Sequence, residues 1–131
     1  MARALDQHKE RLRVLSSFGK DLTRRSKSAC ELCEAREVKL AVYEVEPVQT
    51  EPEYESCLFV CECCKEQLSF PKRVEANHWR CLNNAVWSEI QPVQVVALRM
   101  LRQLSASESW AYELLEEAYF DEDVIAWADS K

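Results

Sequence analysis

Two pairs of cysteines in the sequence have the spacing of metal ligands. Cys30 and Cys33 form one Cys-x2-Cys motif, and Cys61 and Cys64 form a second, 27 residues later. A turn of this spacing directs two thiolates toward one ion, while backbone amides of the turn donate hydrogen bonds to the sulfurs. Two such turns supply four sulfurs in a tetrahedron, the arrangement that zinc prefers. The spacing therefore predicts one zinc site with these four ligands.

Two other chemistries use clustered cysteines. An iron ion with four sulfur ligands and a redox-active dithiol remain alternatives at the same positions. A disulfide framework is disfavoured, because the chain has 7 cysteines, an odd number. Four thiolates fill the coordination sphere of zinc and leave no position for water or substrate. We therefore expect a structural ion, which contributes on the order of 10 kcal/mol to folding and does not catalyse.

The other three cysteines have less defined roles. Cys63 lies next to Cys64, so a pairing of Cys61 with Cys63 is an alternative register, although the x2 spacing of the first pair favours Cys64. Cys57 is expected to pack within a strand. Cys81 falls among helical residues and is expected to be a small buried side chain.

Neither cysteine pair is followed by glycine. Glu34 and Lys65 occupy the two positions after the second cysteines, where a turn of this kind favours positive φ. The sequence therefore predicts some backbone strain there, or a different turn.

The segment between the pairs is predicted to be a β-hairpin. Apolar and polar residues alternate in VKLAVYEVEPV, and SCLFVC forms a second short strand. Pro47 and Pro52 mark the loop between the strands. With a cysteine pair at each end, residues 30–64 have the layout of a zinc ribbon.

The N-terminal segment, residues 1–29, has a helical pattern. Its apolar side chains recur on one face of a helix: Leu5, Leu12, Leu15, Phe18 and Leu22. We expect a break near Gly19, with Ser17 capping a second helix.

The C-terminal segment, residues 65–131, also has a helical pattern, beginning with a short helix in VEANHWRCLNNAVW. Later helix starts are expected at Ser88, with Pro92 near the first helical position, and at Ser105 and Asp121. The sequence predicts a mostly helical α+β protein, in which a zinc-ribbon β-hairpin packs with about five helices in one compact unit.

Charge is distributed unevenly along the chain. Residues 1–29 carry 8 Lys and Arg against 3 acids, a balance of +5; because the whole chain has a net charge of −6, the remainder sums to −11. A basic arm is typical of proteins that bind nucleic acid. It is equally typical of a solvated helix face, and Phe18 is the single aromatic residue of the arm for base stacking. Nucleic-acid binding is therefore an alternative that the sequence does not favour.

Composition limits location and chemistry. No apolar run approaches the roughly 20 residues of a membrane span, and the charged start MARALDQHKERLRVL lacks the apolar core of a secretory signal. We expect a cytoplasmic protein that does not engage membranes. With 1 glycine in the chain, there is no glycine-rich phosphate loop.

A further cluster of side chains has the composition of a ligand pocket. An imidazole, a carboxylate, an amide and two indoles occur within twelve residues: His78, Trp79, Asn83, Trp87 and Glu89. Ordinary structural roles compete with this interpretation. Tryptophans at helical spacing usually pack in a core, His78 can bond locally, and Glu89 suits the first turn of a helix.

Several motifs together resemble the PhnA family of alkylphosphonate-utilisation operon proteins. The resemblance rests on RRSKSACELC, LAVYEV, CLFVCECC, NHWRCLN, VWSEIQPVQVVALRML and FDEDVIAWA, and it extends from about Phe18 to Trp127. It implies that the two cysteine pairs are zinc-ribbon ligands. The motifs NHWRCLN and VWSE are similar to a signature of the family's helical part, which covers His78, Trp79, Cys81, Asn83, Trp87 and Glu89.

The resemblance has limits. Many family members continue into a β-rich, SH3-like domain; we expect this chain to be either a shorter member without that domain or a fragment that contains the ribbon. Some relatives are labelled phosphonoacetate hydrolases, but such metal catalysis requires several His and Asp ligands around open metal sites. The chain has 2 histidines, His8 and His78, in different segments. The sequence therefore favours a non-catalytic binding or regulatory module with one structural Zn²⁺ and an unidentified macromolecular partner; a dimer is compatible with it. A nucleic-acid-binding ribbon and a phosphonate-related hydrolase are the alternatives.

Overall fold

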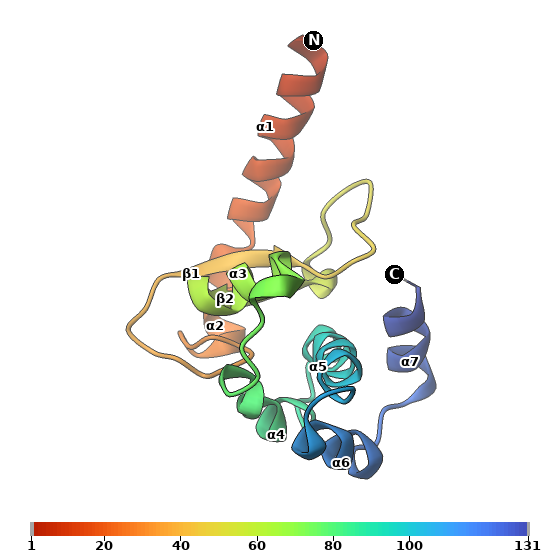
Figure 1. Cartoon of the computed structure of the whole chain (residues 1–131). Coiled ribbons are helices and arrows are strands. Elements are labelled where there is room, and N and C mark those ends of the chain that lie inside the picture. The colour runs from red at the N-terminus through yellow and green to blue at the C-terminus, as the bar shows by residue number, and fades with distance from the viewer. Residues whose placement is uncertain (1, 131) are drawn as a thin grey trace.

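The computed structural model describes residues 2–130, and it contains two strands surrounded by helices (Figure 1). The strands are β1 (Leu40–Glu44) and β2 (Cys57–Cys61). The α-helices of the described residues are α1 (Ala2–Ser17), α2 (Gly19–Ser26), α3 (Glu62–Ser69), α4 (Leu82–Ala85), α5 (Gln91–Leu104), α6 (Ser109–Glu117) and α7 (Glu122–Asp129). Three 3-10 helices complete the order: η1 (Tyr54–Ser56), η2 (Pro71–Arg73) and η3 (His78–Cys81). The expected mostly helical α+β class is confirmed, with seven α-helices among these residues in place of about five.

The predicted hairpin is present. Strands β1 and β2 pair antiparallel, with Leu40 opposite Cys61 and Glu44 opposite Cys57. The strands are shorter than the alternating pattern suggested. One further backbone bond, from Val45 N to Ser56 O at 2.9 Å, lies between the strands and the loop. This register places Cys61 beside Leu40, at the start of β1. The chain before Leu40 leads back to the first cysteine pair, so the two pairs lie at the same end of the hairpin.

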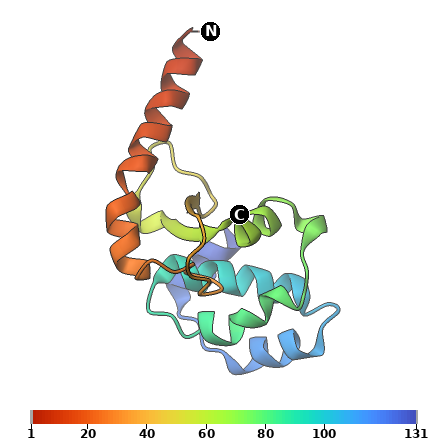
Figure 2. The ribbon, with the colours of Figure 1, turned by 90° about the vertical axis from the view of Figure 1, so that its left-hand side faces the viewer.

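The N-terminal helix breaks where expected, but its cap differs. Helix α1 ends at Ser17, and Phe18 occupies the N-cap position of α2 without a side-chain cap bond. The prediction that Ser17 caps α2 is therefore wrong, because its hydroxyl donates instead to Val14 O at 2.5 Å. Leu22 on α2 is fully buried, whereas Leu5 on α1 is 61% exposed. The apolar face thus meets the core only at its C-terminal end, and α1 projects from the rest of the molecule (Figures 1 and 2).

Helix α5 is the centre of the helical part. Nine of its residues are buried, and both α6 and α7 pack against it. Pro92 lies in its first turn, as predicted. Ser88 does not cap it, because its hydroxyl accepts from Ile90 N and Ile90 is the N-cap residue.

The two later helix starts have different outcomes. Asp121 caps α7 as predicted and accepts from Val124 N at 3.0 Å. Glu108, not Ser105, precedes α6, so the cap predicted at Ser105 is wrong. The short helix predicted before Ser88 forms as η3 followed by α4.

One apolar core joins the hairpin to the helices. The same cluster of buried side chains contains Leu58 and Val60 of β2, Trp79 of η3, and Leu101 of α5. Cys30, Cys61 and Cys64 belong to the same cluster, so the cysteine pairs are continuous with the helical core. None of the helices among residues 2–130 combines the length and apolarity needed to cross a bilayer.

Candidate metal centre

The first cysteine pair lies in a tight turn after α2. Within it, Cys33 N donates to Cys30 Sγ at 3.5 Å, and Glu34 N donates to Cys30 O at 2.9 Å. Glu34 follows with φ of 65°, the left-handed conformation that side chains other than glycine seldom adopt. The strain expected after the first pair is confirmed.

The second pair is arranged differently from the first. Cys61 ends β2 and is the N-cap residue of α3, where its sulfur accepts from Cys64 N at 3.5 Å. The helix begins at Glu62, earlier than the expected start near Lys65, and Lys65 is an ordinary helical residue that does not require glycine. A turn, a hairpin and a helix N-terminus thus surround the site, a layout known as a treble clef, in place of the two turns of a zinc ribbon. The positive end of the α3 dipole faces Cys61 and Cys64 and favours their thiolates.

The four sulfurs converge as the spacing predicts. The Sγ atoms of Cys30, Cys33, Cys61 and Cys64 all lie within 4.8 Å of one another. The Sγ atoms of Cys30 and Cys64 are 3.7 Å apart, as are those of Cys33 and Cys61. A tetrahedral ion with metal–sulfur bonds of ~2.3 Å gives sulfur–sulfur edges of ~3.8 Å, whereas a disulfide requires ~2.05 Å. The geometry therefore fits four thiolate ligands of one metal ion, with Cys64, not Cys63, as the fourth.

The electrostatics of the cluster favour a bound cation. Burial raises the pKa of the Cys33 thiol to about 12. The pKa of Cys64 is also raised, by its hydrogen bond to Cys30 and by burial, while the same hydrogen bond lowers the pKa of Cys30 to about 4. Four thiolates at these distances repel one another, and a divalent cation among them removes that repulsion.

We expect zinc affinity to fall as the pH falls. Because the pKa values of Cys33 and Cys64 are raised, these thiols hold protons at neutral pH in the metal-free protein, and zinc must displace them. Each displaced proton changes the apparent dissociation constant by about tenfold per pH unit. Competition against a chromophoric chelator at several pH values measures this slope. An affinity that is independent of pH between 6 and 8 would contradict this assignment of ligands.

The imidazole of His78 lies beside the sulfurs of Cys63 and Cys64. His78 Nε2 lies 3.2 Å from Cys64 Sγ, and His78 Nδ1 lies 3.7 Å from Cys63 Sγ. The amide of Gln67, which is buried, donates to Cys63 Sγ at 3.3 Å and accepts from Trp79 Nε1 at 2.8 Å. This network connects the metal ligands to the helical core.

We expect His78→Phe to weaken metal binding. A metal-bound Cys64 is a thiolate, which only accepts hydrogen bonds, so His78 Nε2 at 3.2 Å would then donate to it. Loss of such an outer hydrogen bond typically lowers metal affinity about 10–100-fold. The chelator competition measures the change, with Asn83→Ala as the control because the Asn83 side chain is exposed and donates to Arg80 O. Equal affinities of wild type and His78→Phe would exclude this role.

The residues of the predicted ligand pocket occupy different environments. Trp79 is fully buried, and its ring meets that of His78 edge to face with centroids 5.3 Å apart. Trp87 is 60% exposed, and Asn83 and Glu89 are also exposed. The structure therefore brings His78 and Trp79 to the metal centre and leaves the other three at the surface.

An ion pair that was not predicted from the sequence supports the first turn. The side chain of Glu31, between the two cysteines, is 1% exposed and accepts two bonds from Arg25, at 2.7 and 2.9 Å. Glu31 also accepts from Phe59 N, and Arg25 donates to Cys57 O. The pair ties α2 and the first cysteine turn to the outer edge of β2. The signal for this ion pair in the sequence is the acidic residue Glu31 between Cys30 and Cys33.

The three remaining cysteines lie outside the set of ligands. Cys57 is fully buried and donates to Glu53 O at 3.3 Å; burial raises its pKa to about 11. Cys81 is half-buried, and burial raises its pKa to about 12. Cys63 is exposed on α3.

Comparisons with protein-family models, with curated proteins and with solved structures find no match for this chain.

Proposed function

We propose that the chain is a non-catalytic binding or regulatory module built around one structural zinc ion. The observation that carries the proposal is the closed set of four sulfurs, all within 4.8 Å of one another. Four thiolates complete a tetrahedral shell, so such an ion has no vacancy for water or substrate. The two-stranded hairpin is too small to be stable alone, so the ion would supply much of its folding energy.

The motifs described above support membership of the PhnA family as part of this proposal. The two cysteine pairs and NHWRCLN contribute residues to one site, since His78 of that motif contacts Cys64. The resemblance implies that the two cysteine pairs bind zinc. A phosphonate-related hydrolase receives little support, because His8 is an exposed residue of α1 and His78 bonds to the cysteine sulfurs.

The test combines metal analysis with alkylation of the folded protein. One zinc per chain is expected, and mass spectrometry should find Cys30, Cys33, Cys61 and Cys64 protected until a chelator is added. Exposed Cys63 should react at once and serves as an internal control. Two metal ions per chain, bound iron, or rapid alkylation of any of the four ligands would overturn the proposal.

Nucleic-acid binding is the second candidate, favoured by exposed cations on α1 and α2. Lys9, Lys20 and Arg24 are exposed, as is Lys27 directly after α2. Arg25 is committed to a carboxylate of its own chain, which reduces the charge available to phosphates. Fluorescence anisotropy with short DNA and RNA at low salt tests this candidate, since phosphate binding weakens steeply as salt rises. An unchanged anisotropy at low salt would exclude it.

A further inference from the structure

Helix α1 is an arm with no partner over its first turns. Every side chain from residue 4 to residue 10 is exposed, and Leu5 and Leu12 are 61% and 50% exposed. The arm is held at its other end, where Arg11 bonds to Glu44 and to Thr50 O. A helix of this length is marginal in water unless it packs against something. An exposed apolar stripe on such a helix therefore indicates a binding surface.

The total exposed area supports a missing partner. The chain exposes 8424 Å², whereas a compact monomer of 15.3 kDa is expected to expose roughly 7,100 Å². The excess of roughly 1,300 Å² exceeds the roughly 800 Å² that each partner buries in an interface of standard size. Covering the arm would bring the chain to the exposure of an ordinary globular protein.

The chemistry of the arm specifies what can cover it. Leu5, Lys9 and Leu12 are spaced by four and three residues, so they form one stripe, apolar at both ends with a cation between them. A complementary surface needs exposed apolar side chains beside a carboxylate. Two such stripes facing each other would bring the two Lys9 ammonium groups together, which disfavours pairing between stripes.

Such a surface lies at the opposite end of the same molecule. Tyr112 of α6 is 55% exposed, Glu116 in the last turn of the same helix is exposed, and Tyr119, two residues beyond the end of α6, is 78% exposed. Residues 108–123 contain seven acids and no basic residue: Glu108, Glu113, Glu116, Glu117, Asp121, Glu122 and Asp123. We call Tyr112, Glu116 and Tyr119 the acidic face.

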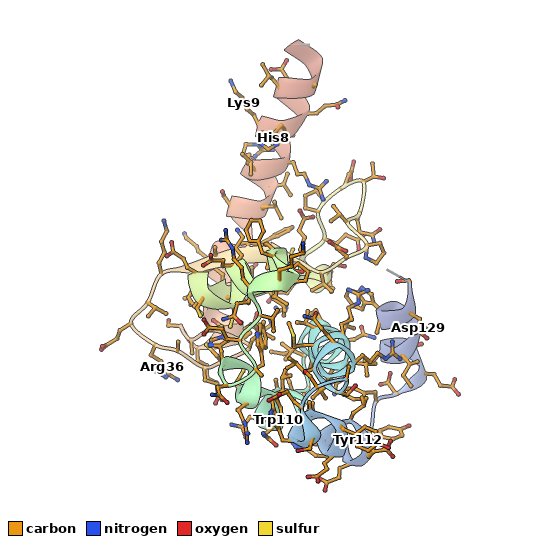
Figure 3. All side chains as sticks on the ribbon, viewed as in Figure 1. His8, Lys9, Arg36, Trp110, Tyr112 and Asp129 are labelled. Atoms are coloured by element: carbon orange, nitrogen blue, oxygen red, sulfur yellow. The ribbon has the colours of Figure 1, made fainter. Side chains whose placement is uncertain are left out.

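The arm cannot reach the acidic face of its own chain. Figure 3 shows Lys9 on the projecting helix and Tyr112 at the far end of the body, and Figure 2 shows the same separation from the side. We propose that the arm docks on the acidic face of a second copy of this chain, and that two copies exchange arms reciprocally. The reciprocal contact closes a two-fold dimer without leaving a free arm. This inference names a partner for the binding role proposed above and rests on it.

Charge exchange tests the contact directly. Lys9→Glu alone and Glu116→Lys alone should each weaken dimerisation about tenfold or more, because every dimer contains the contact twice. The double variant restores an opposite-charge pair at both contacts and should dimerise like the wild type. Both residues are exposed and distant from the cysteines, so the fold and the zinc content should not change. A variant that carries both Leu5→Gln and Leu12→Gln should be a monomer.

Sedimentation velocity at tens of micromolar protein, at ~0.05 M and ~0.5 M salt, measures the association, with zinc measured in each sample. The expected result is a dimer that weakens with salt. A zinc-bound monomer in all conditions overturns this inference and leaves the structural-zinc proposal intact, whereas a sample without zinc overturns that proposal. Three other results would overturn the inference. The dimer could be insensitive to either charge reversal, the double variant could fail to recover dimerisation, or a monomer could bind oligonucleotides through Lys9.

Discussion

Cys64→Ser is expected to release the metal and unfold the protein. Cys64 lies in the first turn of α3 and is fully buried. Its sulfur is 3.7 Å from that of Cys30. A serine hydroxyl is a poor zinc ligand, and a structural zinc site contributes on the order of 10 kcal/mol, comparable to the total stability of a small domain. Circular dichroism on heating and metal analysis should therefore show a chain without zinc and without a cooperative transition.

The neighbouring residue provides a matched control for this variant. Cys63→Ser makes the same chemical change one position earlier, at an exposed thiol outside the four-sulfur cluster. It should keep one zinc per chain and nearly the wild-type unfolding temperature. If Cys63→Ser lost the metal and Cys64→Ser kept it, the register of the second cysteine pair would be wrong.

Trp79→Ala is expected to have the second largest effect. Trp79 is fully buried in the core shared by the hairpin and the helices, and its indole donates to Gln67 at 2.8 Å. Truncation of a buried tryptophan typically costs about 3–5 kcal/mol, since the cavity is only partly refilled. Loss of the indole also removes one hydrogen bond from the buried amide that bonds to Cys63. Urea unfolding of the zinc-bound protein measures the change in free energy of unfolding.

Trp87→Ala is the control for the tryptophan variant. Trp87 is 60% exposed, so the same substitution should change the free energy of unfolding by less than about 0.5 kcal/mol. Equal losses for the two variants would mean that the assignment of Trp79 to the core and Trp87 to the surface is wrong.

The elements that the sequence predicted correctly are governed by local patterns. Alternation of apolar residues predicted the hairpin, and Asp121 predicted the start of α7, because both signals lie within a few residues of the structure they determine. The four sulfurs were predicted for a related reason. The x2 spacing fixes each pair locally, and the hairpin between them then brings the two pairs together.

Features that depend on distant contacts could not be predicted. A cysteine sulfur as the N-cap of α3 has no established sequence signal, so a helix beginning at Glu62 was not predicted. The predicted pocket grouped residues that are close in sequence, but Trp79 of η3 is buried in the core, whereas Trp87 and Glu89, beyond α4, are exposed. Arg25 and Gln67 act through partners that only the folded chain brings near.

X-ray absorption at the zinc edge of the purified protein tests the central claim most directly. The account predicts one zinc per chain with four sulfur neighbours at about 2.3 Å. A nitrogen or oxygen neighbour at about 2.0–2.1 Å would contradict it, because the ion would then have a ligand outside Cys30, Cys33, Cys61 and Cys64 and a position at which chemistry could occur.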